Sequence, residues 1–203
     1  MKRLIFALGF LLLTSCVSAP KNMGGIQEGH WKAKALIKDK EESRSYIVHM
    51  NMNAVREQQA RMDVVSALGT GVASLVVDGK EVRYVLFDSK RFYYGPPQAD
   101  VMRPILAIPF DPRWLHNILF EIPLPEKSWT CVLANGFLSE CRDSVTGVKV
   151  TWSARTGAKK TILIEHTKAS VQINVTGFEA KVEDRKNLFV LEAPQGYQKL
   201  RVR

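Results

Sequence analysis

Hydrophobic and polar residues alternate along most of this chain. Residues 31–38 are the clearest case, with apolar side chains at positions 31, 33, 35 and 37 and lysines at positions 32, 34 and 38. Period-two alternation is typical of a strand that buries one face and exposes the other. Asp78-Gly79 and Asn135-Gly136 predict hairpin turns, whose positions require a positive φ. We predict strands over residues 31–38, 45–52, 60–64, 72–77, 82–86, 91–94, 129–134, 137–141, 148–153, 161–166 and 171–178.

A proline-rich insert divides these strand patterns into two groups. Residues 96–125 hold seven of the nine prolines, which excludes central strands from this region. Two short helices are predicted there, over about residues 98–107 and from Asp111-Pro112 onward, because Asp is a good N-cap and Pro suits the first helical turn. The second helix carries an apolar stripe of Trp114, Leu115, Ile118 and Leu119.

Helices this short must lie against an apolar surface to be stable. A sheet with one apolar face supplies that surface. Strong curvature that nearly closes the sheet also reduces the number of unpaired backbone groups at its edges. We therefore predict a mainly β protein with a small helical part. Its architecture is a strongly curved antiparallel sheet, a half-open β-barrel, capped by short lid helices at about residues 97–121.

The N-terminus indicates export and a lipid anchor. Lys2 and Arg3 precede an uncharged run from Leu4 to Leu13, which is too short to span a bilayer but has the length of a signal-peptide core. The run ends in Leu-Thr-Ser-Cys at positions 13–16, which resembles the bacterial lipobox. That resemblance implies acylation of the Cys16 thiol and cleavage before Cys16. The alternative is an ordinary secretory signal with a cysteine near its cleavage site.

These features divide the chain into three parts. Residues 1–15 are the expected signal peptide, 16–29 the lipidated cysteine with a flexible tether, and 30–203 the folded domain. Val17 follows Cys16 where an Asp would favour retention in the inner membrane, so by analogy with Gram-negative sorting we expect a periplasm-facing outer-membrane location. Two or more acyl chains suffice for stable anchoring.

The charge balance then points to a phospholipid surface rather than nucleic acid. The 203 residues carry a formal net charge of +9. The signal peptide contains two basic and no acidic residues, so its removal lowers the net charge to +7. A positive excess favours an anionic partner. Because a protein facing the periplasm does not meet DNA, we expect no nucleic-acid partner.

The three cysteines are too few for a disulfide-dense scaffold or a four-thiolate zinc site. Cys131 and Cys141 flank the Asn135-Gly136 turn, and an oxidising periplasm favours a disulfide between them. A two-residue loop places Cys131 opposite Glu140, whereas a three-residue loop with a bulge places it opposite Cys141. Two reduced, buried cysteines are the alternative.

No catalytic or metal-binding motif is present. The four histidines are scattered at His30, His49, His116 and His166, without metal-ligand or nucleophile-base spacing. We therefore expect no enzyme activity, catalytic residue, metal or cofactor. An envelope hydrolase whose residues assemble only in space remains an alternative.

Three short patterns carry a family resemblance. Ser66-Ala67-Leu68-Gly69 lies between two predicted strands, residues 108–115 combine Ile-Pro-Phe-Asp-Pro with a Trp-Leu pair, and residues 189–197 read Phe-Val-Leu-Glu-Ala-Pro-Gln-Gly-Tyr. Together with the lipobox and the strand order, they resemble the LolB-like lipoprotein-localisation proteins of the LolA/LolB superfamily. Ser66 and Ala67 depart from the Asn-Pro that precedes Leu-Gly in that family.

The resemblance implies a function. A LolB-like half-barrel and lid enclose an apolar cavity for the acyl chains of lipoproteins, and a loop leucine helps deliver this cargo to the outer membrane. Leu68 and Gly69 would form that membrane-insertion loop, although Leu68 could instead plug the barrel end or pack on its own turn. The expected partners are acyl chains of lipoproteins or other lipids, the membrane through Cys16, and a soluble LolA-like carrier; the protein is expected to be a monomer.

Inward strand positions and the lid would line the cavity. The candidates are Trp31, Tyr46, Val48, Met50, Leu86, Ile105, Trp114 and Ile118. Methionine suits such a pocket because its side chain adapts to irregular ligands. The alternatives are a solid core of the same residues, a pocket for another amphiphile, and a structural subunit of an envelope assembly.

Overall fold

A computed structural model describes residues 23–202, and the predicted signal peptide, Cys16 and the following residues up to 22 lie outside this part. The strands are β1 (Glu28–Asp39), β2 (Arg44–Val55), β3 (Gln59–Ser66), β4 (Gly71–Val77), β5 (Val82–Leu86), β6 (Arg91–Gly95), β7 (Trp129–Ala134), β8 (Phe137–Asp143), β9 (Lys149–Thr156), β10 (Lys159–Glu165), β11 (Ala169–Glu179) and β12 (Gln198–Arg201). The helical elements are η1 (Ala99–Met102), α1 (Arg103–Leu106), α2 (Trp114–Phe120) and α3 (Arg185–Leu188).

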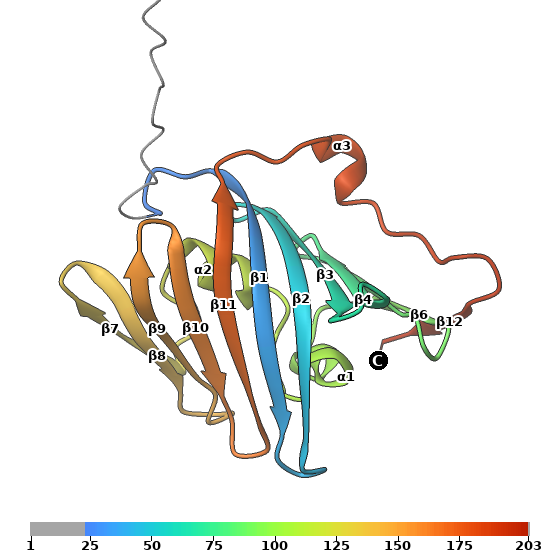
Figure 1. The fold of residues 1–203 in the computed structure, drawn as a ribbon, viewed down its shortest axis with the longest axis horizontal. Coiled ribbons are helices and arrows are strands. Elements are labelled where there is room, and N and C mark those ends of the chain that lie inside the picture. Colours follow the sequence, from blue (N-terminus) through green and yellow to red (C-terminus); the bar gives the residue numbers. More distant parts are fainter. Residues whose placement is uncertain (1–22, 203) are drawn as a thin grey trace, which may run out of the picture.

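All twelve of these strands form one sheet, in the order β12-β6-β5-β4-β3-β2-β1-β11-β10-β9-β8-β7. Neighbouring strands are antiparallel, apart from β6 and β12, which are parallel. The sheet curves but does not close, because β7 and β12 form its two edges (Figure 1). The predicted fold class, a mainly β protein with one strongly curved, open sheet and short helices, is confirmed.

The concave face of the sheet is covered by the helical insert. In Figure 1, α1 and α2 lie behind the central strands, and α2 contacts β2 and β3. The indole Nε1 of Trp152 on β9 donates to the backbone oxygen of Ile118 at 3.1 Å, and Trp31 of β1 meets Phe120 edge-on at 5.1 Å between ring centroids. Helix and sheet therefore share one apolar core.

The insert differs in detail from the two predicted helices. The first is a short 3-10 turn, η1, continued by the single turn of α1, with Pro104 in its first turn. The second begins at Trp114 rather than at Pro112, while the carboxylate of Asp111 accepts the N–H of Arg113 at 2.9 Å. Within residues 23–202, no helix combines the length and the apolar character needed to cross a bilayer.

The segment after β11 crosses the convex face as a strap, residues 180–197, before the chain pairs with β6 (Figure 1). A second, small core lies under it, formed by Val55, Val76, Val182 and Phe189. Arg61 of β3 donates to the backbone oxygen of Leu188 at 2.7 Å, which fixes α3 over the sheet. Strand alternation alone does not predict this outer core.

The predicted flexible tether includes residues 23–29, but these residues belong to the fold. Met23 is only 5% exposed, and β1 already begins at Glu28. The guanidinium of Arg56 donates to the backbone oxygens of Met23 and of Ile26, the latter at 2.7 Å. The folded domain therefore begins at about Met23, which shortens the tether.

The two predicted hairpin turns behave differently. Asn135 and Gly136 have φ values of 53° and 78°, and form the expected two-residue turn between β7 and β8. By contrast, Asp78-Gly79 is not a two-residue turn, because Val77 pairs with Val82 across a four-residue loop. Asp78 instead accepts the N–H groups of Lys80 and Glu81 with its carboxylate, at 3.2 and 2.9 Å.

A disulfide joins Cys131 and Cys141. The two-residue turn begins a register in which Cys131 would face Glu140, but the pairing shifts by one residue between Leu133 and Val132. This shift leaves one β8 residue unpaired and brings Cys141 opposite Cys131. The hairpin thus combines the short turn of one predicted alternative with the bulge of the other.

Candidate functional site

The interior of the half-barrel is packed in this conformation. Leu86, one of the eight predicted cavity residues, packs against a core cluster. Six others belong to this cluster and are at most 8% exposed: Trp31, Val48, Met50, Ile105, Trp114 and Ile118. Of these, Trp114 also borders a surface cavity of about 370 Å³ beside the lid. The solid-core alternative therefore describes this state.

Methionines make the packed interior adaptable. Met52 pairs with Met62 across β2 and β3, and with Trp31 across β1 and β2. Met50 and Met102 are buried in the same cluster. Unbranched methionine side chains repack at low cost around irregular apolar groups. The core beneath the lid can therefore change shape more readily than a core of β-branched residues.

Tyr46 does not line the interior, and this prediction is corrected. Its inward position in the β2 alternation is right, but the residue is 45% exposed. The cause is strand length: β3 ends at Ser66, opposite Val48, so β2 projects beyond its neighbour by several residues. Tyr46 and the adjacent Ile47, which is 49% exposed, therefore lie at the rim of the sheet.

Leu68 projects from the turn that joins β3 and β4. It is 94% exposed, which excludes the alternatives in which it plugs the barrel end or packs on its own turn. Ser66 shapes the turn: its Oγ accepts the N–H groups of Leu68 and Thr70 at 3.3 and 3.2 Å, and its backbone oxygen accepts from Gly69 at 3.0 Å. Gly69 has φ of 84°, a conformation that favours glycine. The turn therefore holds Leu68 in water.

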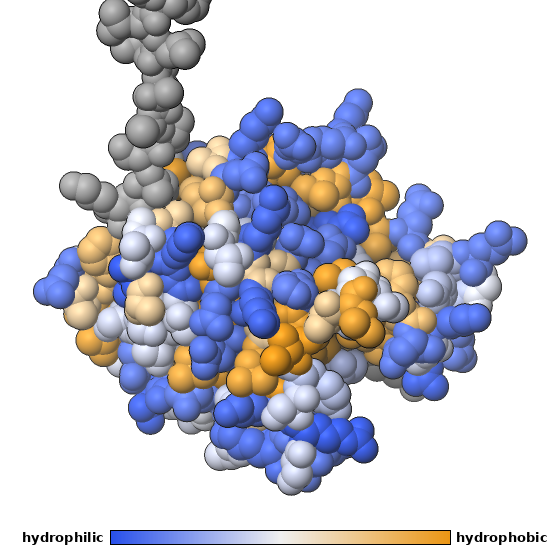
Figure 2. Space-filling view, viewed as in Figure 1, coloured by the Kyte–Doolittle hydropathy of each residue, from blue (hydrophilic) through white to orange (hydrophobic). Residues whose placement is uncertain are grey.

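Other apolar side chains are exposed around this turn. Val72 is 39% exposed at the start of β4, and Tyr46 and Ile47 extend β2 to the level of the turn. We call these four residues the Leu68 tip: Tyr46, Ile47, Leu68 and Val72. Figure 2 shows several separate hydrophobic patches among hydrophilic residues on this face of the molecule. Clustered exposed apolar residues are typical of interaction sites with membranes or partners.

Buried charges hold the far end of the lid helix. Lys160 of β10 is 4% exposed, and its Nζ lies 2.8 Å from a carboxylate oxygen of Glu121 and 2.9 Å from the backbone oxygen of Leu119. Arg155 pairs with the other oxygen of Glu121 at 3.0 Å. Burial lowers the pKa of Lys160, and the adjacent Glu121 carboxylate opposes that shift. We call Glu121, Arg155 and Lys160 the lid network, because it ties the end of α2 to β9 and β10.

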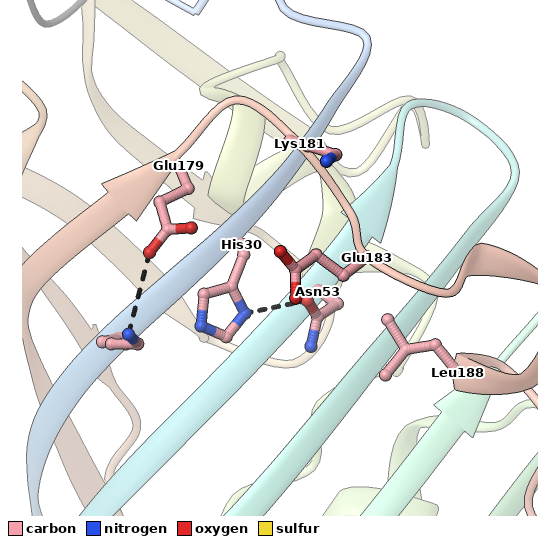
Figure 3. Close-up of a pocket in the computed structure, with 7 residues that line it drawn as sticks. His30, Asn53, Glu179, Lys181, Glu183 and Leu188 are labelled. Atoms are coloured by element: carbon pink, nitrogen blue, oxygen red, sulfur yellow. Dashed lines mark hydrogen bonds and ion pairs between the residues drawn. The ribbon is translucent and has the colours of Figure 1, made fainter.

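The convex face carries a polar pocket of about 260 Å³ under the strap (Figure 3). His30 Nδ1 lies 2.8 Å from Oδ1 of the buried Asn53, and Lys32 pairs with Glu179 at 3.7 Å. Glu183 also borders this pocket. Charges of both signs are mixed there, and residues 23–202 contain no cluster of three or more His, Cys, Asp or Glu side chains that could hold a metal ion.

The other histidines stand on separate elements. His49 is exposed on β2, His166 lies in the turn between β10 and β11, and His116 is half-buried on α2. Burial lowers the pKa of His116; Glu57 opposes this shift and Arg56 adds to it. The structure thus brings the Leu68 tip together at one end of the sheet, and the predicted cavity residues other than Tyr46 together in a packed core.

Comparison with known proteins gives structural neighbours only. No protein-family model matches the sequence, and no curated protein matches it. Among solved structures, a LolA superfamily protein from Nitrosomonas europaea is 7% identical, covering 78% of this chain and 89% of its own, with a TM-score of 0.49. A domain described as a putative outer membrane lipoprotein-sorting protein from Vibrio parahaemolyticus is 9% identical, covering 82% and 92%, with a TM-score of 0.45.

A third neighbour is an uncharacterized conserved protein from Thermus thermophilus. It is 10% identical, covers 87% of this chain and 91% of its own, and has a TM-score of 0.47. The two neighbours with described families thus come from the LolA superfamily and from lipoprotein sorting. At these identities the functional proposal rests on the residues of this chain.

Proposed function

We propose that this chain is a periplasmic lipoprotein, anchored in the outer membrane through acylated Cys16, that binds acyl chains beneath its lid and transfers lipoproteins into that membrane. The observation that carries the proposal is Leu68, a large apolar side chain that is 94% exposed on a turn built to hold it there. Burying an exposed leucine gains about 1.5–3 kcal/mol, which biases docking without anchoring the protein.

The packed interior defines the binding step. An acyl chain enters when α1 and α2 move away from the sheet and the methionines beneath them repack. α1 has a single turn and α2 has two, so their own stability is low and they depend on the core for it. Transfer is non-covalent, and no enzymatic step is part of the proposal.

Uptake of lipid by the mature chain tests the binding step. We expect a protein starting at Val17 to co-purify with acyl lipids or to take up a hydrophobic dye such as N-phenylnaphthylamine, and a competing fatty acid to displace the dye. Dye uptake that neither lipoprotein acyl groups nor free fatty acids displace would favour another amphiphile. A chain that neither co-purifies with lipid nor takes up dye contradicts a carrier role.

The lipid anchor has its own test. In cells, we expect the full chain to fractionate with outer membranes, to incorporate labelled palmitate, and to lose both properties in the Cys16→Ser variant. A soluble, unlabelled mature protein would show that the N-terminus is an ordinary secretory signal. That outcome would remove the tether from the proposal while leaving the Leu68 tip intact.

A further inference from the structure

The hairpin of β7 and β8 exposes a second apolar group at the opposite end of the sheet. Val132 is 53% exposed and Leu133 is 64% exposed, while Phe137 is half-buried beyond the turn. We call these three residues the β7–β8 tip. β7 is an edge strand, and none of its residues is charged or proline. Edge strands that face water usually carry such residues, because they prevent pairing and aggregation.

The chain leaves the fold next to this tip. Met23 and Gly24, the first described residues, line a groove of about 270 Å³ together with Leu133, Gly136 and Phe137. Phe120 and Pro123, at the end of the lid, form another wall of the groove. The tether therefore emerges between the hairpin and the lid.

The length of the tether restricts which part of the domain stays near the anchor. Cys16 and Met23 are seven residues apart, so a fully extended chain between them spans at most about 25 Å. A relaxed flexible chain of this length spans about 15 Å. In both cases the β7–β8 tip lies within reach of the leaflet that holds Cys16.

The Leu68 tip lies much farther from the anchor. Both positions can be compared along β2. Val48 pairs with Ser66, so the Leu68 turn lies beside Val48. Val55 pairs with Glu28, so the root of the tether lies near Val55. Seven residues of strand span about 23 Å. When the sheet stands upright on the leaflet, the two tips therefore lie at different heights, and only the tip beside the tether root meets the leaflet.

We infer that the β7–β8 tip is a membrane-contact surface, and that it rests on the phospholipid leaflet that holds Cys16. This inference depends on the acylation of Cys16 proposed above. The disulfide and the two-residue turn keep the tip in one shape. The guanidinium of Arg155, which pairs with Glu121, lies 5.4 Å from the Phe137 ring centroid and packs this ring against the fold. Lys159 is exposed on the neighbouring β9–β10 hairpin, where a cation can meet anionic lipid headgroups.

Depth-dependent quenching tests this surface. Full-length lipidated protein carrying Leu133→Trp is reconstituted into phosphatidylglycerol-containing vesicles, with or without phosphatidylcholine brominated in its acyl chains. The control is Val145→Trp, because Val145 is 80% exposed on the β8–β9 turn at the other end of the hairpin. We expect the bromine-dependent loss of emission to be at least about twofold larger for Leu133→Trp than for Val145→Trp, over the background of the four native tryptophans.

The outcomes separate the two proposals. Equal quenching of both variants, in protein whose intact mass shows the acyl chains, overturns the membrane contact and leaves the proposed function standing. A mass without acyl chains contradicts the proposed anchor instead. If the Leu133→Trp emission shifts to the blue without vesicles and with rising protein concentration, then β7 pairs with a second copy of the chain, and the inference is also overturned.

Discussion

The two ends of the sheet present different kinds of apolar surface. At one end, the most exposed residue of the Leu68 tip is Leu68 itself, on a turn that hydrogen bonds shape but that no packing covers. At the other end, the β7–β8 tip lies on a disulfide-linked hairpin, beside the tether root and the lid network. The two proposals assign these ends different tasks: one end holds the domain near its own leaflet, and the other end is free to meet cargo or a second surface.

The largest expected effect is a loss of stability when the lid network is broken, compared with almost none when the Leu68 tip is changed. Glu121→Ala leaves Lys160 buried without its carboxylate, and breaking a buried pair in this way costs about 3–5 kcal/mol of unfolding free energy. Leu68→Ala removes a side chain that projects into water, so its effect stays within about 0.5 kcal/mol. Urea unfolding of both variants measures the contrast.

Lys160→Met is the matched control for that experiment. It removes the buried cation but leaves Glu121 paired with Arg155, so the loss should be smaller than for Glu121→Ala. If Glu121→Ala unfolds at the same urea concentration as wild type, then the lid network does not hold α2 to the sheet.

Removal of the disulfide in the β7–β8 hairpin is expected to have the next largest effect on the free energy of unfolding. The disulfide closes a loop with a sequence separation of 10, and the loop-entropy relation gives a loss of about 2.8 kcal/mol for the Cys131→Ser, Cys141→Ser double variant. Hydrogen exchange should rise in β7 and β8, while amides of the Leu68 turn keep their wild-type rates. A rise of equal size at both ends would show that the tips are not independent.

Acid should weaken the lid more than the Leu68 turn. Because burial lowers the pKa of His116 below its ordinary value of 6.5, the unfolded chain binds a proton below about pH 6.5 that the folded chain does not bind. Stability therefore falls as the pH drops from about 7.5 to about 5. His116→Gln should reduce this part of the pH dependence, measured as the shift of the urea midpoint between the two pH values. An unchanged shift would assign the pH dependence to other groups.

The smallest effect concerns the shape of the Leu68 turn. Ser66→Ala removes the hydroxyl that accepts two backbone N–H groups, and exposed hydrogen bonds of this kind contribute about 0.5–1.5 kcal/mol. We expect little change in global stability but faster amide exchange at Leu68 and Thr70. Thr146→Ala, in the β8–β9 turn, is the control and should leave those two amides unchanged.

Much of this fold follows from local pattern, and the exceptions have physical causes. Alternation identifies the strands because each buries one face. Tyr46 breaks the rule because burial also requires a neighbouring strand, and β3 ends before reaching it. Alternation also places Lys160 on the inner face with Ile162 and Ile164, but a lysine is expected at the surface, and only the carboxylate of Glu121, far away in sequence, explains its burial.

Whether the barrel interior is open or filled could not be predicted. The same apolar residues line a cavity or form a core, depending on whether their volumes fill the space beneath the lid. The exposure of Leu68 likewise depends on the turn geometry of Ser66 and Gly69 rather than on hydrophobicity. The β7–β8 tip was missed because its importance lies in its position beside Met23, which sequence spacing does not show.

The most direct test of the account follows lipoproteins in cells of the native host. The chain is depleted and replaced by wild type, by Leu68→Glu or by the similarly exposed control Val145→Glu. The account predicts that depletion and Leu68→Glu leave lipoproteins in the periplasm or inner membrane, while wild type and Val145→Glu restore them to the outer membrane. Normal outer-membrane lipoproteins after depletion would contradict the localisation role, and full rescue by Leu68→Glu would contradict the role of the Leu68 tip.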